Sequence, residues 1–211
     1  MKLYKIGNAV FNRFSTNGIL EDMEIKFFEN AVWGKVFEHN SKSGAVVFSS
    51  IDEVKKCNTQ DKYSRIYLLD YFKAVDNKIE FLLEYPDDKP TEYNRWKQTN
   101  NPCNEYMGNT RPVTGYEAVH IDWTANYWGG LERNSSNPTT FGYCYLDGSV
   151  GHSYWWYAIG PKAAYQSGIP GPNVVIKNRT QIWVRLDTLP EENKCRVTKN
   201  DCLVANDFYE V

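Results

Sequence analysis

Apolar and polar residues alternate in several short segments of the chain, as they do along half-buried β-strands. In the segment Ile79–Tyr85 the odd-numbered residues are large and apolar, whereas Glu80 and Glu84 fall on the opposite side. Successive side chains of a strand point to opposite faces of a sheet, so this pattern predicts an antiparallel strand with one buried face. The segments Tyr116–Trp123 and Gln181–Asp187 repeat the pattern.

Other segments predict strands less directly. Glu24–Phe28 and Trp33–Phe37 have strand-like composition, and the apolar run Ala45–Phe48 fits a short buried strand. Tyr154–Ile159 is aromatic on both faces, as a central strand of a sandwich would be. The segment Tyr63–Phe72 mixes helical spacing with strand-prone residues, and its period does not decide between helix and strand.

A capping box predicts one short helix. Ser50 can accept a hydrogen bond from a backbone N–H of the first turn, and Glu53 can reach back towards the cap. We expect this helix to run from about Ile51 to Cys57. Turn-forming segments separate the strands, among them Asp147-Gly148, which fits a tight hairpin turn. The fold class is therefore expected to be all-β, mainly an antiparallel β-sandwich or jelly roll, with one or two short helices.

A soft border at Pro86–Tyr93 divides the chain into two regions. Residues 1–92 are expected to form an N-terminal β-rich attachment or packing region, and residues 93–211 a β-sandwich region. A length of 211 residues suits a single all-β unit, so we expect one compact domain overall. Residues Met1–Ser15 are either an attachment segment or an ordinary first strand.

Charge and hydropathy exclude some classes of partner. The 24 basic and 26 acidic residues give a net charge of −2 without a basic patch, which argues against nucleic acid. There is no long apolar run, so no membrane insertion is expected. The N-terminus lacks the pattern of a secretory signal, which predicts synthesis in a cytoplasm. The odd, scattered set of five cysteines favours reduced thiols, with a Cys195–Cys202 bridge as the alternative.

Six aromatic and turn-rich motifs follow one another in the second half of the chain: Tyr93–Pro102, Tyr127–Leu131, Asp147–Val150, Trp155–Gly160, Ile169–Pro172 and Ile182–Arg185. As an ordered set, spanning Tyr93 to Asp187, they resemble a lectin-like β-sandwich module. Such modules recur at the ends of tail fibres and other surface proteins of gut bacteria and their phages. The resemblance implies extracellular recognition or virion structure and supplies no catalytic residues.

Several tryptophans are candidates for a sugar-binding platform, because sugar rings stack on flat aromatic side chains while nearby polar groups bind the hydroxyls. Trp183 is the first candidate, since it falls on the polar face of its strand. The alternative is that these rings pack under loops or against a neighbouring subunit, because tryptophan is usually well buried. The expected ligand-binding residues are Gln181, Trp183, Arg185, Arg95, Trp96 and Trp128.

Two chemical alternatives to this platform are a metal site and a catalytic site. His120 and Asp122 point to the same side of a strand and, with His152, could hold a metal, but a hydrogen-bonded pair or a subunit contact that holds a loop explains that spacing better. We therefore expect no metal and no cofactor. Paired carboxylates could serve a glycosidase, and those available are Glu80, Glu84, Glu117, Asp122 and Asp147. Ser153 beside His152 cannot form a triad, because neighbours on a strand face opposite ways.

The sequence thus predicts a non-enzymatic recognition module, a phage fibre or appendage protein that contacts a host-surface glycan. The alternative is a structural virion protein without a free ligand, and a glycan-active hydrolase is the remaining possibility. Shallow glycan sites gain useful affinity through multivalency, so a homo-oligomer is expected, a trimer if the chain tips a fibre. The expected location is the virion or the extracellular surface.

Overall fold

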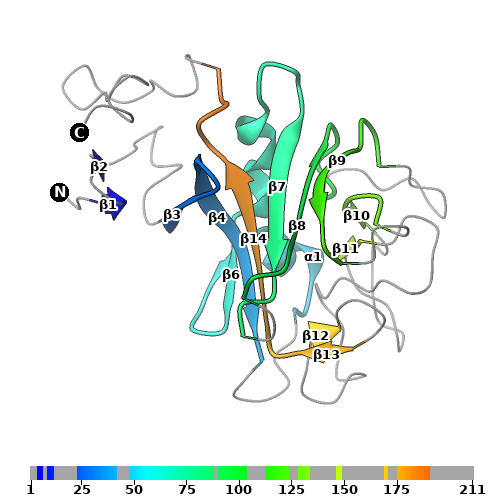
Figure 1. Cartoon of the computed structure of the whole chain (residues 1–211). Helices are drawn as coiled ribbons and strands as arrows, with labels where there is room; N and C mark the ends of the chain where they lie inside the picture. Colours follow the sequence, from blue (N-terminus) through cyan, green and yellow to red (C-terminus); the bar gives the residue numbers. More distant parts are fainter. Residues whose placement is uncertain are drawn as a thin grey trace.

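The main feature of the computed structural model is one antiparallel sheet of eight strands (Figure 1). The structure describes residues 4–6, 9–11, 23–41, 48–87, 90–103, 113–123, 128–133, 146–148, 169–170 and 175–190. The strands of the sheet are β3 (Ile25–Phe28), β4 (Ala31–Asn40), β5 (Cys57–Asn58), β6 (Lys62–Ser64), β7 (Ile79–Glu84), β8 (Tyr93–Gln98), β9 (Glu117–Ile121) and β14 (Arg179–Arg185). Their order is β5-β6-β4-β14-β7-β8-β9, and β3 pairs with β4 beside β6.

Three two-stranded sheets and two helices complete the described elements. The small sheets are β1 (Tyr4–Ile6) with β2 (Ala9–Phe11), β10 (Glu132–Arg133) with β11 (Leu146–Asp147), and β12 (Ile169–Pro170) with β13 (Ile176–Lys177). The helices are α1 (Ile51–Lys55) and the 3-10 helix η1 (Ile66–Phe72), and both lie behind the large sheet in Figure 1. These elements confirm the expected all-β, antiparallel fold with two short helices. No described helix is long and apolar enough to cross a membrane.

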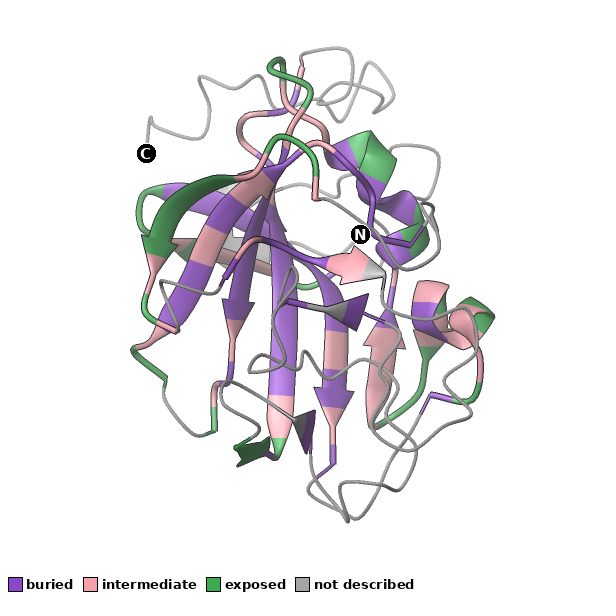
Figure 2. Ribbon diagram, turned by 90° about the vertical axis from the view of Figure 1, so that its right-hand side faces the viewer, coloured by how far each residue is buried: buried purple, intermediate pink, exposed green. Residues whose placement is uncertain are grey.

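The large sheet buries both of its faces. The inner face carries residues such as Phe81, Trp96 and Ile182 into the main core, which also contains Val54 of α1 and Leu69 of η1. The outer face carries a second, smaller apolar cluster made of Ala31, Trp33, Leu82, Tyr93 and Trp183. Figure 2 shows the central strands buried along most of their length.

Strand β14 occupies the middle of the sheet, between β4 and β7. Gln181 lies opposite Glu38 of β4 and Glu84 of β7. Trp183 lies opposite Lys35 of β4 and Leu82 of β7. Strands on both sides of the predicted border at residues 86–93 therefore share one sheet.

Several of the strands predicted from the sequence are present in the structure. Strands over Glu24–Phe28, Trp33–Phe37, Ile79–Tyr85, Tyr116–Trp123 and Gln181–Asp187 are confirmed, with shifted ends. The expected strands at 45–47 and 154–159 lie outside the described residues.

The expectation that β7 has one polar, solvent-facing side is wrong. Glu80 on that side is only 4% exposed. Arginine side chains from the neighbouring strands cover it and pair with its carboxylate, so an acidic residue on an alternating strand need not be solvated.

The capping box forms with one change. Ser50 Oγ accepts from the Glu53 N–H at 3.2 Å, as expected. The Glu53 carboxylate accepts from the Ser49 N–H at 2.6 Å and not from the Ser50 N–H. The helix ends at Lys55, two residues before the expected end, because Lys56 is extended and Cys57 enters β5.

The ambiguous segment 63–72 contains both structures. It begins at the end of β6 and continues as η1, with Ser64 as the last strand residue. The Ser64 hydroxyl donates to the Val54 carbonyl and so fastens α1 to this junction. The mixed pattern in the sequence thus reflects a change of secondary structure within the segment.

A buried glutamine joins β8 to the segment at residues 128–131. Gln98 Oε1 accepts from Trp96 Nε1 at 2.8 Å and from the Leu131 N–H at 2.9 Å, and Nε2 donates to the Leu131 carbonyl at 3.0 Å. Gly130 has φ 94°, and a Cβ there would lie 2.8 Å from Gln98 Oε1, so both backbone and space require glycine.

Replacing Gln98 is expected to be costly, because it leaves several buried polar groups without partners. Gln98→Ala should lower the free energy of unfolding by about 3 kcal/mol or more, measured by urea denaturation. The control is Lys97→Ala, which removes only half-exposed ion pairs and should cost less than about 1 kcal/mol. Equal losses in the two variants would show that Gln98 does not hold this junction.

Candidate ligand-binding site

Trp183 lies on the outer face, where the sequence placed it, but its ring is covered. Only 2% of the residue is exposed. Lys26 Nζ lies 4.2 Å from the ring centroid, and Lys35 Nζ lies 5.7 Å from it. Trp183 Nε1 donates to Glu84 Oε1 at 2.9 Å, and Glu84 also accepts from Lys26 at 2.7 Å. A ring held under ion-paired cations cannot stack against a sugar.

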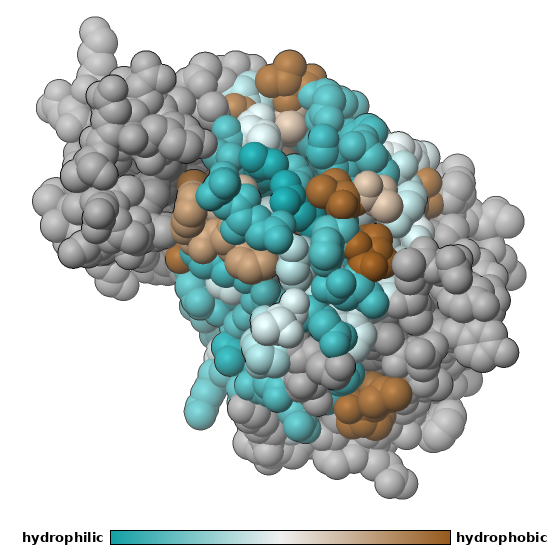
Figure 3. Space-filling model, in the orientation of Figure 1, coloured by the Kyte–Doolittle hydropathy of each residue, from teal (hydrophilic) through white to brown (hydrophobic). Residues whose placement is uncertain are grey.

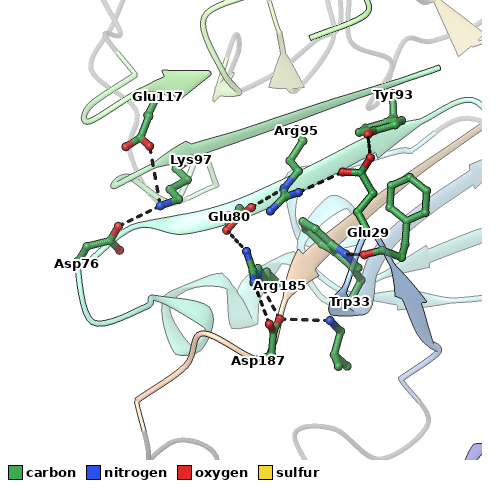
Figure 4. Close-up of polar contacts among 12 residues, drawn as sticks. Glu29, Trp33, Asp76, Glu80, Tyr93, Arg95, Lys97, Glu117, Arg185 and Asp187 are labelled. Atoms are coloured by element: carbon green, nitrogen blue, oxygen red, sulfur yellow. Dashed lines mark hydrogen bonds and ion pairs between the residues drawn. The ribbon is translucent and has the colours of Figure 1, made fainter. Parts of the chain in front are cut away.

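Arg95 and Arg185 are both committed to a network that crosses the outer face (Figure 4). Arg95 Nε donates to Glu80 Oε1 at 2.6 Å, and Arg185 donates to the other Glu80 oxygen at 3.3 Å. Arg185 also holds Asp187 through two bonds of 2.9 Å. Arg95 further lies 5.4 Å from the centroid of the Trp33 ring and so covers that ring. Both arginine side chains therefore make their contacts within the sheet.

Trp96 and Trp128 lie in the main core, on the other face of the sheet from Trp183. Trp96 stacks on Phe81 at 5.1 Å and meets Trp128 edge-on at 4.7 Å between ring centroids. Their exposed fractions are 0% and 4%. The three predicted platform tryptophans are thus not brought together, and each is buried within this one chain.

His120 and Asp122 lie side by side at the end of β9, at the distance of an ion pair. His120 Nε2 lies 3.0 Å from Asp122 Oδ1, and the imidazole stacks on Tyr93 at 4.4 Å. Asp122 Oδ2 accepts from the Tyr93 N–H at 2.9 Å, which ties the end of β9 to the start of β8. Among the described residues no group of three or more possible ligands could hold a metal ion, and His152 lies outside them.

Four of the five carboxylates considered for acid and base catalysis, those of Glu80, Glu84, Glu117 and Asp122, have partners in the structure. Glu80 is held by two arginines, and Glu84 by Lys26 and the Trp183 indole. Glu117 pairs with Lys78 at 2.8 Å on the edge strand β9. No ionic partner is described for Asp147, whose side chain lies outside the described part.

A polar pocket opens beside β4, at a place that the sequence did not indicate. It has a volume of about 430 Å³. Strand β4 pairs with β3 up to Gly34 and with β6 from Phe37 onwards, so its neighbour changes between these two residues. Lys35 points outwards at this interruption. The described lining residues are Glu24, Lys35, Glu38, Asn58, Thr59, Gln60, Asp61, Lys62 and Tyr63.

Two carboxylates and one lysine form the inner wall of the pocket. Lys35, which is 7% exposed, pairs with both Glu24 and Glu38. Glu38 also accepts from Arg179 at 2.7 Å and from Gln181 at 3.0 Å, so Gln181 supports the pocket from behind. Burial alone would raise the pKa of the Glu38 carboxyl, but the bonds from Lys35 and Arg179 outweigh it and hold that pKa below the ordinary value of 4.5.

The β5–β6 hairpin forms the outer wall. The Thr59 hydroxyl accepts from the Lys62 N–H at 3.1 Å, and the Thr59 N–H donates to the Lys62 carbonyl at 2.7 Å, which fixes the turn. The side chains of Asn58 and Gln60 are exposed and make no hydrogen bond to any described residue. These two amides are therefore available to a ligand, as is the Glu24 carboxylate, whose side chain is 57% exposed.

Part of this site carried a signal in the sequence. Asn58-Thr59-Gln60-Asp61 is a run of four polar residues that includes the turn formers Asn and Asp, and it fits a turn. Lys35 and Glu38 interrupt the apolar strand that runs through Val36 and Phe37. The missing information was the pairing of β4, which brings Glu24 and the turn together.

Comparison with known proteins adds no relative to this picture: no family model matches the chain, and neither a curated protein nor a solved structure matches it. The resemblance to lectin-like modules between Tyr93 and Asp187 consequently stays a prediction.

The lowered pKa of Glu38 predicts a loss of stability in acid. A carboxyl group whose pKa is lower in the folded chain than in the unfolded chain stabilises the fold above its unfolded pKa. This contribution should be present above the ordinary value of 4.5 and disappear as the pH falls below it. Unfolding free energies measured by urea titration across this range should fall less steeply with acidification in Glu38→Gln.

The control for this experiment is Asp52→Asn, which removes one exposed carboxylate from α1. That variant should keep the acid dependence of the unmodified chain. If Glu38→Gln and the unmodified chain lose stability in parallel below pH 4.5, the Lys35–Glu38–Arg179 cluster does not stabilise the fold through the Glu38 charge.

Proposed function

We propose that this chain is a non-enzymatic recognition module that binds a glycan in the pocket between β4 and the β5–β6 hairpin. The single observation that carries the proposal is the pocket itself, about 430 Å³ in volume and lined by amide, hydroxyl, carboxylate and ammonium groups. Small-molecule sites have volumes of roughly 300–1,000 Å³, so a short stretch of sugar fits. A polyhydroxylated ligand suits such a lining because each hydroxyl both donates and accepts hydrogen bonds.

The free groups of the pocket support this choice. Asn58 and Gln60 offer amide donors and acceptors at the mouth, and Glu24 offers a carboxylate oxygen to a pair of hydroxyls. Tyr63 is half-buried and adds an aromatic side chain to the lining. The site therefore combines free polar groups with one aromatic side chain, although this aromatic residue differs from the tryptophans expected from the sequence.

The state of the pocket carboxylates favours binding over hydrolysis. A glycosidase needs one carboxyl group that is protonated and gives its proton to the leaving group. Glu38 is instead held ionised by Lys35 and Arg179, and Glu24 is exposed beside the same lysine. This arrangement suits hydrogen-bond acceptors, which is the role that we assign to both groups.

A structural virion protein without a free ligand is the second candidate. The observation that favours it is the burial of the predicted platform tryptophans, which leaves no exposed indole ring at Trp96, Trp128 or Trp183. Figure 3 shows a described surface that is mostly hydrophilic, with separate hydrophobic spots. The virion or extracellular location remains part of both proposals and rests on the resemblance. The homo-oligomer, a trimer if the chain tips a fibre, belongs to the glycan-binding proposal and rests on the multivalency that shallow sites need.

The test of the proposed site is glycan binding by a variant that lacks the free amides. The double variant Asn58→Ala and Gln60→Ala should bind about tenfold or more weakly to any polysaccharide that the unmodified chain retains, because each hydrogen bond contributes about 1 kcal/mol. Affinity electrophoresis and titration calorimetry on polysaccharides from gut bacteria would measure the change. Its thermal unfolding should stay close to that of the unmodified chain, since both side chains are exposed.

The matched control is Tyr71→Ala, which removes an exposed aromatic ring from η1 on the helix side of the sheet. This variant should keep full affinity. If Tyr71→Ala loses binding and the double variant does not, the glycan site lies elsewhere. If the unmodified chain binds no glycan and assembles only with a partner protein in light scattering, the structural candidate replaces the first.

A further inference from the structure

We infer that the pocket selects neutral glycans and rejects acidic ones, such as glycans built from uronic or sialic acids. The inference rests on the proposed function of this pocket and specifies its ligand class. It follows from how the two ammonium groups of the lining, Lys35 and Lys62, are already used.

The charges of the described lining leave no surplus of positive charge. Three carboxylates, those of Glu24, Glu38 and Asp61, face two ammonium groups, so the net charge of the lining is −1. The next residues do not reverse the balance. Arg179 adds a positive charge behind Glu38, Arg65 adds one beside the Tyr63 ring, and Glu53 adds a negative charge behind Lys62, so the sum is not positive. An anionic ligand would therefore meet a wall without surplus positive charge.

Both lysines are bound to carboxylates within the protein. Lys35 lies between Glu24 and Glu38, and its remaining contacts are the rings of Trp183 and Tyr63, at 5.7 and 5.8 Å from their centroids. Lys62 pairs with Glu53, whose other oxygen accepts from the Ser49 N–H at 2.6 Å. A carboxylate on a ligand would have to share Lys35 or Lys62 with the carboxylates already paired to them, and it would be repelled by those carboxylates.

Neutral hydroxyls avoid this penalty. They can donate to the outer oxygen of Glu24 and accept from the amides of Asn58 and Gln60 without displacing any ion pair. Binding of such a ligand changes no charge pairing, so its affinity should depend little on salt concentration.

The experiment compares neutral tetrasaccharides with their uronic acid counterparts of the same linkage, by titration calorimetry on the full chain at about 50 mM and about 500 mM NaCl. The neutral member should bind about tenfold or more tightly, with an affinity that is nearly the same at both salt concentrations. Equal or tighter binding of the acidic member overturns the inference but leaves glycan binding intact. Binding of neither member overturns the proposed function and the inference with it.

A second arm uses a variant that releases one lysine. Glu53→Gln keeps a hydrogen-bond acceptor for the Ser49 N–H but removes the charge that pairs with Lys62. Affinity for the acidic tetrasaccharide should rise about fivefold, while affinity for the neutral one stays unchanged. Asp52→Asn is the matched control, since it removes the same charge one residue away, outside the pocket lining, and should change neither affinity. No gain in Glu53→Gln, or an equal gain in Asp52→Asn, would contradict the assigned role of Lys62.

Discussion

The insertion of β14 between β4 and β7 is the constraint on which the rest of the structure depends. Its contact between Arg179 and Glu38 joins positions 141 residues apart. The strand carries Ile182 to the main core and Trp183 to the outer face, and thus links both apolar clusters. It also supplies Gln181 and Arg179, which hold Glu38 at the pocket wall. Contacts of such long range are slow to form because the entropy of loop closure opposes them, so the pocket wall is completed only when the centre of the sheet closes.

Long charged side chains make the outer face of this sheet possible. Trp33 and Trp183 would expose large apolar areas on a sheet face that no described helix covers. Lys26 and Arg95 lie over these rings, and their charges are neutralised by Glu84 and Glu80 of strand β7. The methylene stem of each side chain covers an aromatic ring, while its charged end is paired at the surface. The rings are buried in this way without a second layer of apolar residues.

The alternation of residue types predicted much of the fold but little of the site. It placed Trp183 and Glu80 on the polar side of their strands, and the structure agrees on the side while burying both residues. Alternation indicates on which face of the sheet a side chain lies. The exposure of that side chain depends on neighbouring strands that are distant in sequence. The capping signal of Ser50 is local and could therefore be predicted from the sequence. The contact of Glu24 with the Asn58–Tyr63 hairpin depends on the register of β4 and could not be predicted in this way.

The position of the pocket follows from the lengths of the strands beside β4. That strand has ten residues, and β3 and β6, with four and three residues, cover its edge in two separate pieces. At Lys35 and Val36 the edge passes from one neighbour to the other: the Lys35 N–H donates to the Glu24 carbonyl, and the Arg65 N–H donates to the Val36 carbonyl. The pocket opens beside this change of neighbour. A ligand that binds there would meet Lys35 and Glu38, which ion pairs within the sheet hold in place, on one side and the Thr59 turn on the other, so only the exposed Asn58, Gln60 and Glu24 side chains would have to be ordered on binding.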